Sequence, residues 1–191
     1  VYCWGNDSYR QLGGGKSVVI RLGSLSFHIP ALVPGLNSVQ SVESGAFHSC
    51  ALINGGMVCW GLNNSYQLGH LSQGAACLGQ ACSYPTTVPL VFGATQASLG
   101  ANFSCARISN GSVSCFGSNA FGQLGNPDVK GSTFNPVSSK GLQGIKQVAS
   151  GAFHSCSLSD AGEVRCWGLN TFGQAGQSPE VALVTEPAPT L

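Results

Sequence analysis

Charged side chains are scarce in this sequence. Of the 191 residues, 8 are Lys or Arg and 7 are Asp or Glu, which makes 8% of the chain, whereas a globular domain usually carries about 25%. The few cations are scattered along the chain, and the net charge is only +1. Because binding to a nucleic acid needs Lys and Arg clustered against phosphates, we expect no nucleic-acid partner.

Long hydrophobic runs are also absent. No stretch approaches the roughly 20 apolar residues of a membrane-spanning helix, so we expect no membrane span in this chain. The sequence starts at Val1 with neither an initiator Met nor a signal peptide, and we expect it to be a portion of a longer polypeptide. Hydrophobic residues still make up 43% of the chain, which is enough for the core of one all-β domain.

One segment of the sequence recurs at a nearly fixed interval. It reads SGAFHSCALINGGMVCWG from Ser44, LGANFSCARISNGSVSCFG from Leu99 and SGAFHSCSLSDAGEVRCWG from Ser150, and its tail reads VYCWG from Val1. The spacing is about fifty residues, which is typical of one supersecondary unit in a propeller, a solenoid or an array. It is marked by Cys3, Cys59, Cys115 and Cys166.

Each complete copy predicts a β-hairpin. Two short runs of strand-forming residues flank turns at 54–55, 109–111 and 160–162, which contain Asn-Gly or end in Gly. Counting outward from each turn places two cysteines directly opposite each other, where Cα atoms lie about 4.5 or 5.5 Å apart, within disulfide range. We therefore predict three cross-strand disulfides, each contributing roughly 2–3 kcal/mol: Cys50–Cys59, Cys105–Cys115 and Cys156–Cys166.

Nine cysteines leave an odd one. Cys77 and Cys82 are close enough in sequence to form a small loop disulfide, and Cys3 then stays unpaired. In the other copies, the partner lies about ten residues upstream, so the partner of Cys3 belongs to a strand before residue 1 or to another subunit. Such frequent pairing predicts an oxidising, extracellular compartment and a secreted protein.

Asn-x-Ser sequons agree with secretion, because they are acceptors for N-linked glycans. The sequence aligns Asn6 and Asn63 at the same place after Trp-Gly, and Asn110 lies on a hairpin tip. We expect glycans at one or more of four positions: Asn6, Asn63, Asn102 and Asn110.

The remainder of each repeat predicts two further strands. A Pro-containing edge strand is expected at 30–33, 85–91, 136–137 and 187–191, since Pro cannot donate to an inner ladder. A strand before each hairpin is expected at 36–45, 91–100 and 142–151. Four strands are typical of a propeller blade, whereas a β-helical solenoid needs shorter coils. The predicted region, 1–191, divides into an outer half-blade and three complete blades: 1–35, 36–90, 91–141 and 142–191.

The residues SGAFHSCAL, the hairpin, VCWG and then N-x-x-x-QLG resemble the repeats of the regulator-of-chromosome-condensation family. The resemblance implies blades of a seven-bladed β-propeller. The cysteines that flank the hairpin resemble the extracellular, crinkly-type members found in plant receptor kinases and in secreted bacterial proteins. Because this repeat is a scaffold for unrelated tasks, the resemblance fixes the fold better than the function.

Three functions follow as hypotheses. The first is a secreted, non-catalytic interaction or assembly module that binds a protein partner or copies of itself, for example as a glycosylated subunit of an extracellular filament or coat. The second is the ligand-binding ectodomain of a receptor kinase or a secreted protein inhibitor. The third is guanine-nucleotide exchange on a small GTPase, which needs a reducing intracellular setting and so conflicts with the cysteine pairing.

The sequence contains few candidates for a catalytic or metal site. His48 and His154 lie beside cysteines, but Phe103 replaces the histidine in the second hairpin, and a disulfide sulfur cannot act as a nucleophile. Zinc on His48, Cys50 and Cys59 is a further alternative, although a hairpin separation suits a disulfide better. We expect no catalytic residue, no metal and no cofactor. Contact surfaces are expected on the variable insertions, at 16–29, 70–84 and 126–134.

Overall fold

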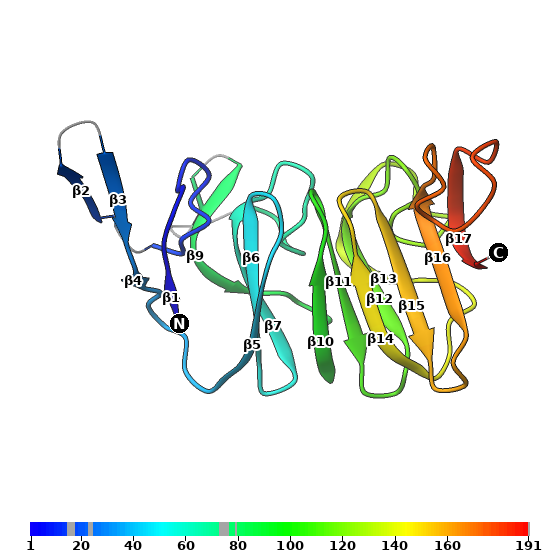
Figure 1. Ribbon diagram of the computed structural model, residues 1–191. Coiled ribbons are helices and arrows are strands. Elements are labelled where there is room, and N and C mark those ends of the chain that lie inside the picture. The colour runs from blue at the N-terminus through cyan, green and yellow to red at the C-terminus, as the bar shows by residue number, and fades with distance from the viewer. Residues whose placement is uncertain (15–17, 23–24, 73–76, 79, 191) are drawn as a thin grey trace.

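The computed structural model describes residues 1–14, 18–22, 25–72, 77–78 and 80–190. Over these residues it is built of antiparallel β-strands, and the predicted all-β fold with four-stranded antiparallel sheets is confirmed. Figure 1 shows three sheets side by side, with the two chain ends at opposite sides of the row. Within the described ranges, no helix is long and apolar enough to cross a membrane.

Each of the three large sheets lies within one predicted blade range. The first blade pairs its strands in the order β5-β6-β7-β9-β8, the second in the order β10 to β13 and the third in the order β14 to β17. Their bounds are β5 (Val39–Ser44), β6 (His48–Ile53), β7 (Gly56–Leu62), β8 (Cys77–Leu78), β9 (Ala81–Thr87), β10 (Ala94–Leu99), β11 (Phe103–Ile108), β12 (Val113–Ser118), β13 (Ser132–Ser138), β14 (Ile145–Ser150), β15 (His154–Ser159), β16 (Val164–Leu169) and β17 (Leu183–Pro189).

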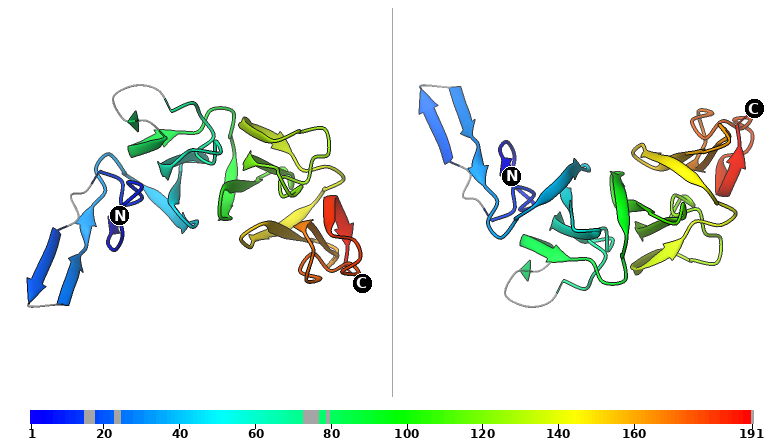
Figure 2. Two further views of the ribbon diagram at one scale, coloured as in Figure 1. Left: turned by 90° about the horizontal axis from the view of Figure 1, so that it is seen from above. Right: turned by 90° about the horizontal axis from the view of Figure 1, so that it is seen from below.

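The N-terminal region forms a smaller unit, which we call the half-blade. In it, β1 (Tyr2–Cys3) pairs only with β4 (Ala31–Leu32) among the described strands. The insertion between them contains a hairpin of β2 (Val18–Leu22) and β3 (Leu25–Ile29), which the sequence pattern does not predict. Figure 2 shows this hairpin extending away from the blades.

The central hairpins have the predicted register. Cys50 pairs with Cys59, and the two corresponding pairs in the other blades are also directly opposed. In the first hairpin both turn residues have positive φ, 51° at Asn54 and 74° at Gly55, as a tight type I′ turn requires. The turn chemistry therefore sets which residues face each other.

The outer strands begin earlier than predicted, at 81, 132 and 183. Their prolines fall where the ladder shifts register: Pro136, for example, lies between the paired residues Thr133 and Val137. A bulge leaves residues outside the ladder, so the missing N–H of Pro interrupts no hydrogen bond there. A strand can therefore start before its proline, whereas the predicted strands each began at the proline.

The hydrophobic core lies between blades. One cluster joins the first blade to the second through Leu52, Met57, Leu68, Ala97 and Phe116, and includes the Cys50–Cys59 pair. A second cluster joins the second blade to the third through Val113, Leu124, Ile145, Val148 and Trp167. Stacking of neighbouring blades thus buries the apolar side chains that one blade alone would leave exposed.

Candidate functional site

The blades contact each other through one recurring aromatic position. Trp60 and Trp167 are fully buried, and each indole N–H donates to a Gln carbonyl of the preceding repeat, Gln11 at 2.8 Å and Gln123 at 2.9 Å. Phe116 has no N–H, and at its interface the hydroxyl of Ser104 donates to the Gln67 carbonyl at 2.8 Å. This position therefore packs one blade on the previous one.

A buried asparagine shapes the turn before each interface. Its Oδ1 accepts a hydrogen bond from a backbone N–H five residues later, and its Nδ2 donates to atoms of the following loop. The set comprises Asn63, Asn119 and Asn170, and in the half-blade Asp7 Oδ1 accepts from Leu12 N in the same way. These side chains connect the blade face to the inserted loop.

The glycan at Asn63 stays a prediction, but the side chain is buried rather than exposed as expected. Asn63 is 3% exposed, and its Nδ2 donates to the His70 carbonyl and to Ser72 Oγ, both at 2.8 Å. A glycan on that nitrogen would destroy both bonds. The alignment with Asn6 was also off by one residue, because Asp7 holds the equivalent place.

The other sequons stay predictions. Asn6 and Asn110 are exposed, and Asn110 occupies the tip of the second hairpin. Asn102 is half-buried, and Ser104 of its sequon is fully buried.

The predicted stapled hairpins are confirmed. The sulfur atoms of the four predicted pairs lie 1.93–2.17 Å apart, in Cys50–Cys59, Cys77–Cys82, Cys105–Cys115 and Cys156–Cys166. Cys3 is free and half-buried, and burial raises the pKa of its thiol.

His48 is a buried neutral side chain. Its Nε2 lies 2.9 Å from Ser104 Oγ of the next blade, and burial lowers its pKa to about 3. A Cβ on Gly45 would lie 2.4 Å from its ring, so glycine leaves room for the imidazole. Burial lowers the pKa of His154 as well. Since the cysteines on these strands are in disulfides, neither histidine has a thiolate to activate.

A cavity lies between the half-blade and the first blade. It has a volume of about 490 Å³, and its lining includes Cys3, Trp4, Leu12, Val42 and His48. Trp4 is 63% exposed, whereas its equivalents Trp60 and Trp167 are 0% exposed. Among the described residues, Trp4 has no contact that corresponds to the hydrogen bond of Trp60 and of Trp167 with the preceding repeat.

The third blade presents the opposite open face. At the closed faces, an aromatic residue of each turn meets one from the next blade: Tyr9 and Phe47 have ring centroids 4.9 Å apart, and Phe121 and Phe153 5.3 Å apart. The equivalent Phe172 is 90% exposed. Over the described residues, two blade faces are therefore open, one lined by Trp4 and one by Phe172.

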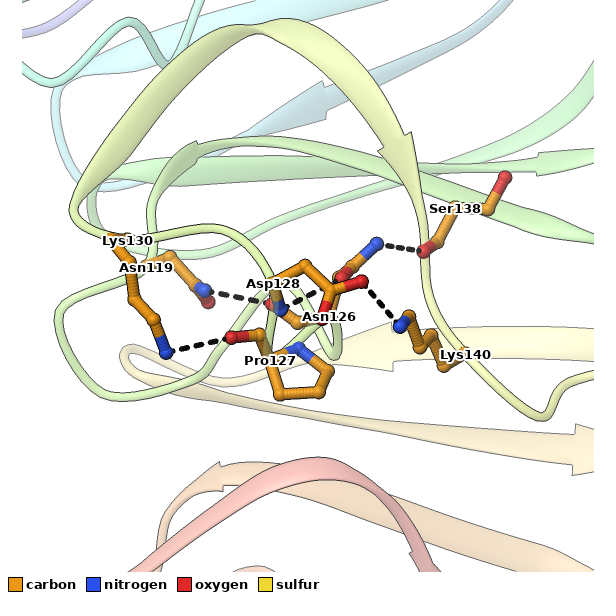
Figure 3. Close-up of polar contacts among 7 residues, drawn as sticks. All are labelled: Asn119, Asn126, Pro127, Asp128, Lys130, Ser138 and Lys140. Atoms are coloured by element: carbon orange, nitrogen blue, oxygen red, sulfur yellow. Dashed lines mark hydrogen bonds and ion pairs between the residues drawn. The ribbon is translucent and has the colours of Figure 1, made fainter.

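The insertion at 126–134 is a braced loop (Figure 3). Lys140 pairs with Asp128, Lys130 Nζ donates to the Pro127 carbonyl at 2.9 Å, and Asn126 Nδ2 donates to the Ser138 carbonyl at 3.0 Å. These bonds hold the loop in one shape, which suits a contact surface. The other two predicted contact loops lie partly outside the described residues, at 16–17, 23–24, 73–76 and 79.

The repeat also matches a known family. A family model described as the regulator of chromosome condensation (RCC1) repeat matches residues 1–52, 54–107 and 110–158, and a second model of that repeat matches 94–123 and 145–174. The chain belongs to this family.

Known relatives are longer than this chain. It is 36% identical to the ultraviolet-B receptor UVR8 of Arabidopsis thaliana over 146 residues, which is 72% of this chain and 31% of UVR8. The fold is similar to that of human WBSCR16, with a TM-score of 0.80, 22% identity, and coverage of 98% of this chain and 46% of that one. Prp20p of Saccharomyces cerevisiae gives a TM-score of 0.58, 23% identity, and coverage of 98% and 58%.

Sequence reasoning missed one group of side chains. Within the described ranges, one cluster of His, Cys, Asp or Glu could hold a metal, and it consists of His70, Cys77 and Cys82 rather than His48, Cys50 and Cys59. Apart from the proximity of the two cysteines, nothing in the sequence indicates this cluster, because the position of His70 depends on how the insertion folds.

Proposed function

We propose that this chain is a non-catalytic protein-interaction module of an oxidising, extracellular compartment, and that its open faces bind further blades of the same repeat. One contrast carries the proposal: Trp4 is 63% exposed where its equivalents Trp60 and Trp167 are fully buried, and Phe172 is 90% exposed where its equivalents Tyr9 and Phe121 pack on rings of the next blade. The blades belong to the same polypeptide or to another copy of it.

The exposed groups on the two open faces specify which side chains and strands a binding partner must supply. On the half-blade, the occupant supplies an antiparallel strand beside β1 with a cysteine opposite Cys3, as in the three complete hairpins. On the third blade, it supplies an aromatic ring against Phe172 and a donor for the carbonyl of Gln174, which corresponds to Gln123. Another blade of this repeat meets all these requirements.

Contact between unlike faces is head-to-tail, and such contacts produce rings or filaments. This is the arrangement expected of a subunit of an extracellular coat or filament. The described binding of Prp20p to Gsp1p and histones supports a protein, rather than a small molecule, as the partner class for this fold. No particular observation favours a receptor ectodomain or an inhibitor over assembly.

The disulfides support the extracellular part of the proposal. Four pairs in a chain of this length are typical of secreted proteins, because cytosolic thiols are kept reduced. The same pairing opposes guanine-nucleotide exchange in the cytosol or nucleus. Glycans at Asn6, Asn102 or Asn110 would follow from passage through a secretory pathway that attaches them.

The test is the molar mass of the oxidised chain by light scattering after size exclusion, over a range of concentrations. We expect concentration-dependent association, weakened by Trp4→Ser and by Phe172→Ser, because each removes apolar area from one open face. Phe92→Ser, at a 74% exposed position between β9 and β10 and so outside the half-blade and the third blade, is the control. A monomer at all concentrations, or association that neither face variant changes, would contradict the proposal.

A further inference from the structure

A histidine and a disulfide lie together in the insertion of the first blade. A ring nitrogen of His70 and the Sγ atoms of Cys77 and Cys82 are all within 4.8 Å of one another. The three residues are 7%, 7% and 0% exposed. Cys77 and Cys82 also belong to the hydrophobic cluster that joins the first blade to the second, but the proposed function gives His70 no role.

The hydrogen bonds of His70 leave one ring nitrogen available. Nδ1 lies 3.0 Å from the carbonyl oxygen of Leu71, and since a carbonyl only accepts, Nδ1 carries the proton and donates it. Nε2 then holds a lone pair, and it is buried with no hydrogen-bond partner among the described groups. An imidazole whose other N–H donates to a backbone carbonyl is the usual arrangement of a metal-binding histidine.

A hydrogen bond to its backbone carbonyl also fixes the position of His70. Its carbonyl accepts a hydrogen bond from Nδ2 of the buried Asn63 at 2.8 Å, and Asn63 Oδ1 accepts from Leu68 N at 2.9 Å. The two cysteines are directly opposed on β8 and β9. His48 offers a useful comparison, because it also has a buried nitrogen without a partner, Nδ1, but it belongs to no such cluster.

We propose that reduction of the Cys77–Cys82 disulfide converts this cluster into a site for a thiophilic ion of the Zn²⁺ class. Nε2 of His70 and the two thiolates supply three ligands, and a water supplies the fourth. Donor atoms around tetrahedral zinc lie about 3–4 Å apart, so the 4.8 Å cluster needs only small side-chain movements. The disulfide form holds no ion, because its sulfur atoms are bonded to each other.

The chemistry balances with a phosphine as reductant. The phosphine takes oxygen from one water molecule and becomes a phosphine oxide, the S–S bond breaks, and the two hydrogens of the water become the two thiol protons. Zn²⁺ then displaces both protons as it binds. The site is therefore a redox-switched metal site, and it is independent of whether the open blade faces bind other blades.

The experiment uses the whole chain with Co²⁺ as a spectroscopic probe. The protein is reduced with a phosphine, freed of it without oxygen, and titrated while the thiolate-to-cobalt absorption is recorded. We expect one ion per chain. The absorption is lost in C77S/C82S, while His70→Gln weakens binding about tenfold or more. The matched control, C105S/C115S, removes a disulfide with no clustered histidine and keeps the site.

A second measurement covers the case in which full reduction unfolds the chain. The disulfides are partly reduced, Zn²⁺ is added, and the released thiols are alkylated and mapped by mass. We expect Zn²⁺ to protect Cys77 and Cys82 and to leave the other released cysteines reactive. Equal protection of all released cysteines, no protection, or cobalt absorption unchanged in both His70→Gln and C77S/C82S would overturn the proposal.

Discussion

The half-blade and the complete blades share the same turn hydrogen bond, but they differ in the burial of their aromatic residue. In both, a side-chain oxygen at the turn accepts a backbone N–H five residues later, as in Asp7 to Leu12 and Asn119 to Leu124. Yet Trp4 is 63% exposed, and Trp167 is 0% exposed. Local sequence thus sets the turn, whereas the neighbouring blade sets the burial of the aromatic residue, and the preceding strand of the same hairpin sets the pairing of the cysteine.

The largest expected difference is between the two tryptophans. Trp167→Ala removes a buried ring and its hydrogen bond to Gln123, so we expect the free energy of unfolding to fall by about 3–5 kcal/mol. Trp4→Ala should change it by about 0.5 kcal/mol or less, as for an exposed residue. Urea unfolding of both variants measures the contrast, and equal losses would show that the neighbouring blade does not account for it.

The cysteines give a smaller contrast. C105S/C115S removes a hairpin disulfide that closes a short loop, so the free energy of unfolding should fall by about 2–3 kcal/mol. Cys3→Ser should leave it within about 0.5 kcal/mol, because Cys3 has no partner in the described chain. Unfolding of oxidised samples is the measurement. A large loss for Cys3→Ser would mean that its thiol already serves the fold.

A smaller effect is the dependence of stability on pH. It should differ between the first hairpin, which contains His48, and the second hairpin, in which Phe103 takes the place of the histidine. Unfolded histidine has a pKa near 6.5, whereas burial holds folded His48 at about 3. Between these values the unfolded chain binds more protons, so stability falls as pH drops below 6.5, by about 2 kcal/mol at pH 5. This contribution is fully present above pH 6.5 and is exhausted near pH 3.

The variant His48→Phe should remove that share of the acid sensitivity. Its loss of stability between pH 7 and pH 5 is expected to be about 2 kcal/mol less than that of the parent chain. His154→Phe, at a less buried position, is the matched control and should recover less. The free energy of unfolding at both pH values is measured for each protein, and identical pH dependence in all three would refute the assignment.

Much of the fold was predictable because it depends on local chemistry that repeats. Turn residues such as Asn54-Gly55 fixed the hairpin register, and the register placed the cysteines opposite each other. The outer strands were less predictable, because a bulge accommodates Pro136 inside a strand. Asn63 was misread as an exposed sequon, since its burial depends on bonds to an insertion that no repeat pattern describes. The proximity of His70 to Cys77 and Cys82 could not be predicted for the same reason, because it depends on how that insertion folds.

The most direct test of an oxidised, stapled module is mass mapping of its peptides without reduction, on protein isolated from its native source after free thiols are blocked. The account predicts four linked peptide pairs, joining Cys50 to Cys59, Cys77 to Cys82, Cys105 to Cys115 and Cys156 to Cys166. Blocked free thiols at the hairpin cysteines would contradict it, because a reduced chain cannot belong to the compartment proposed here.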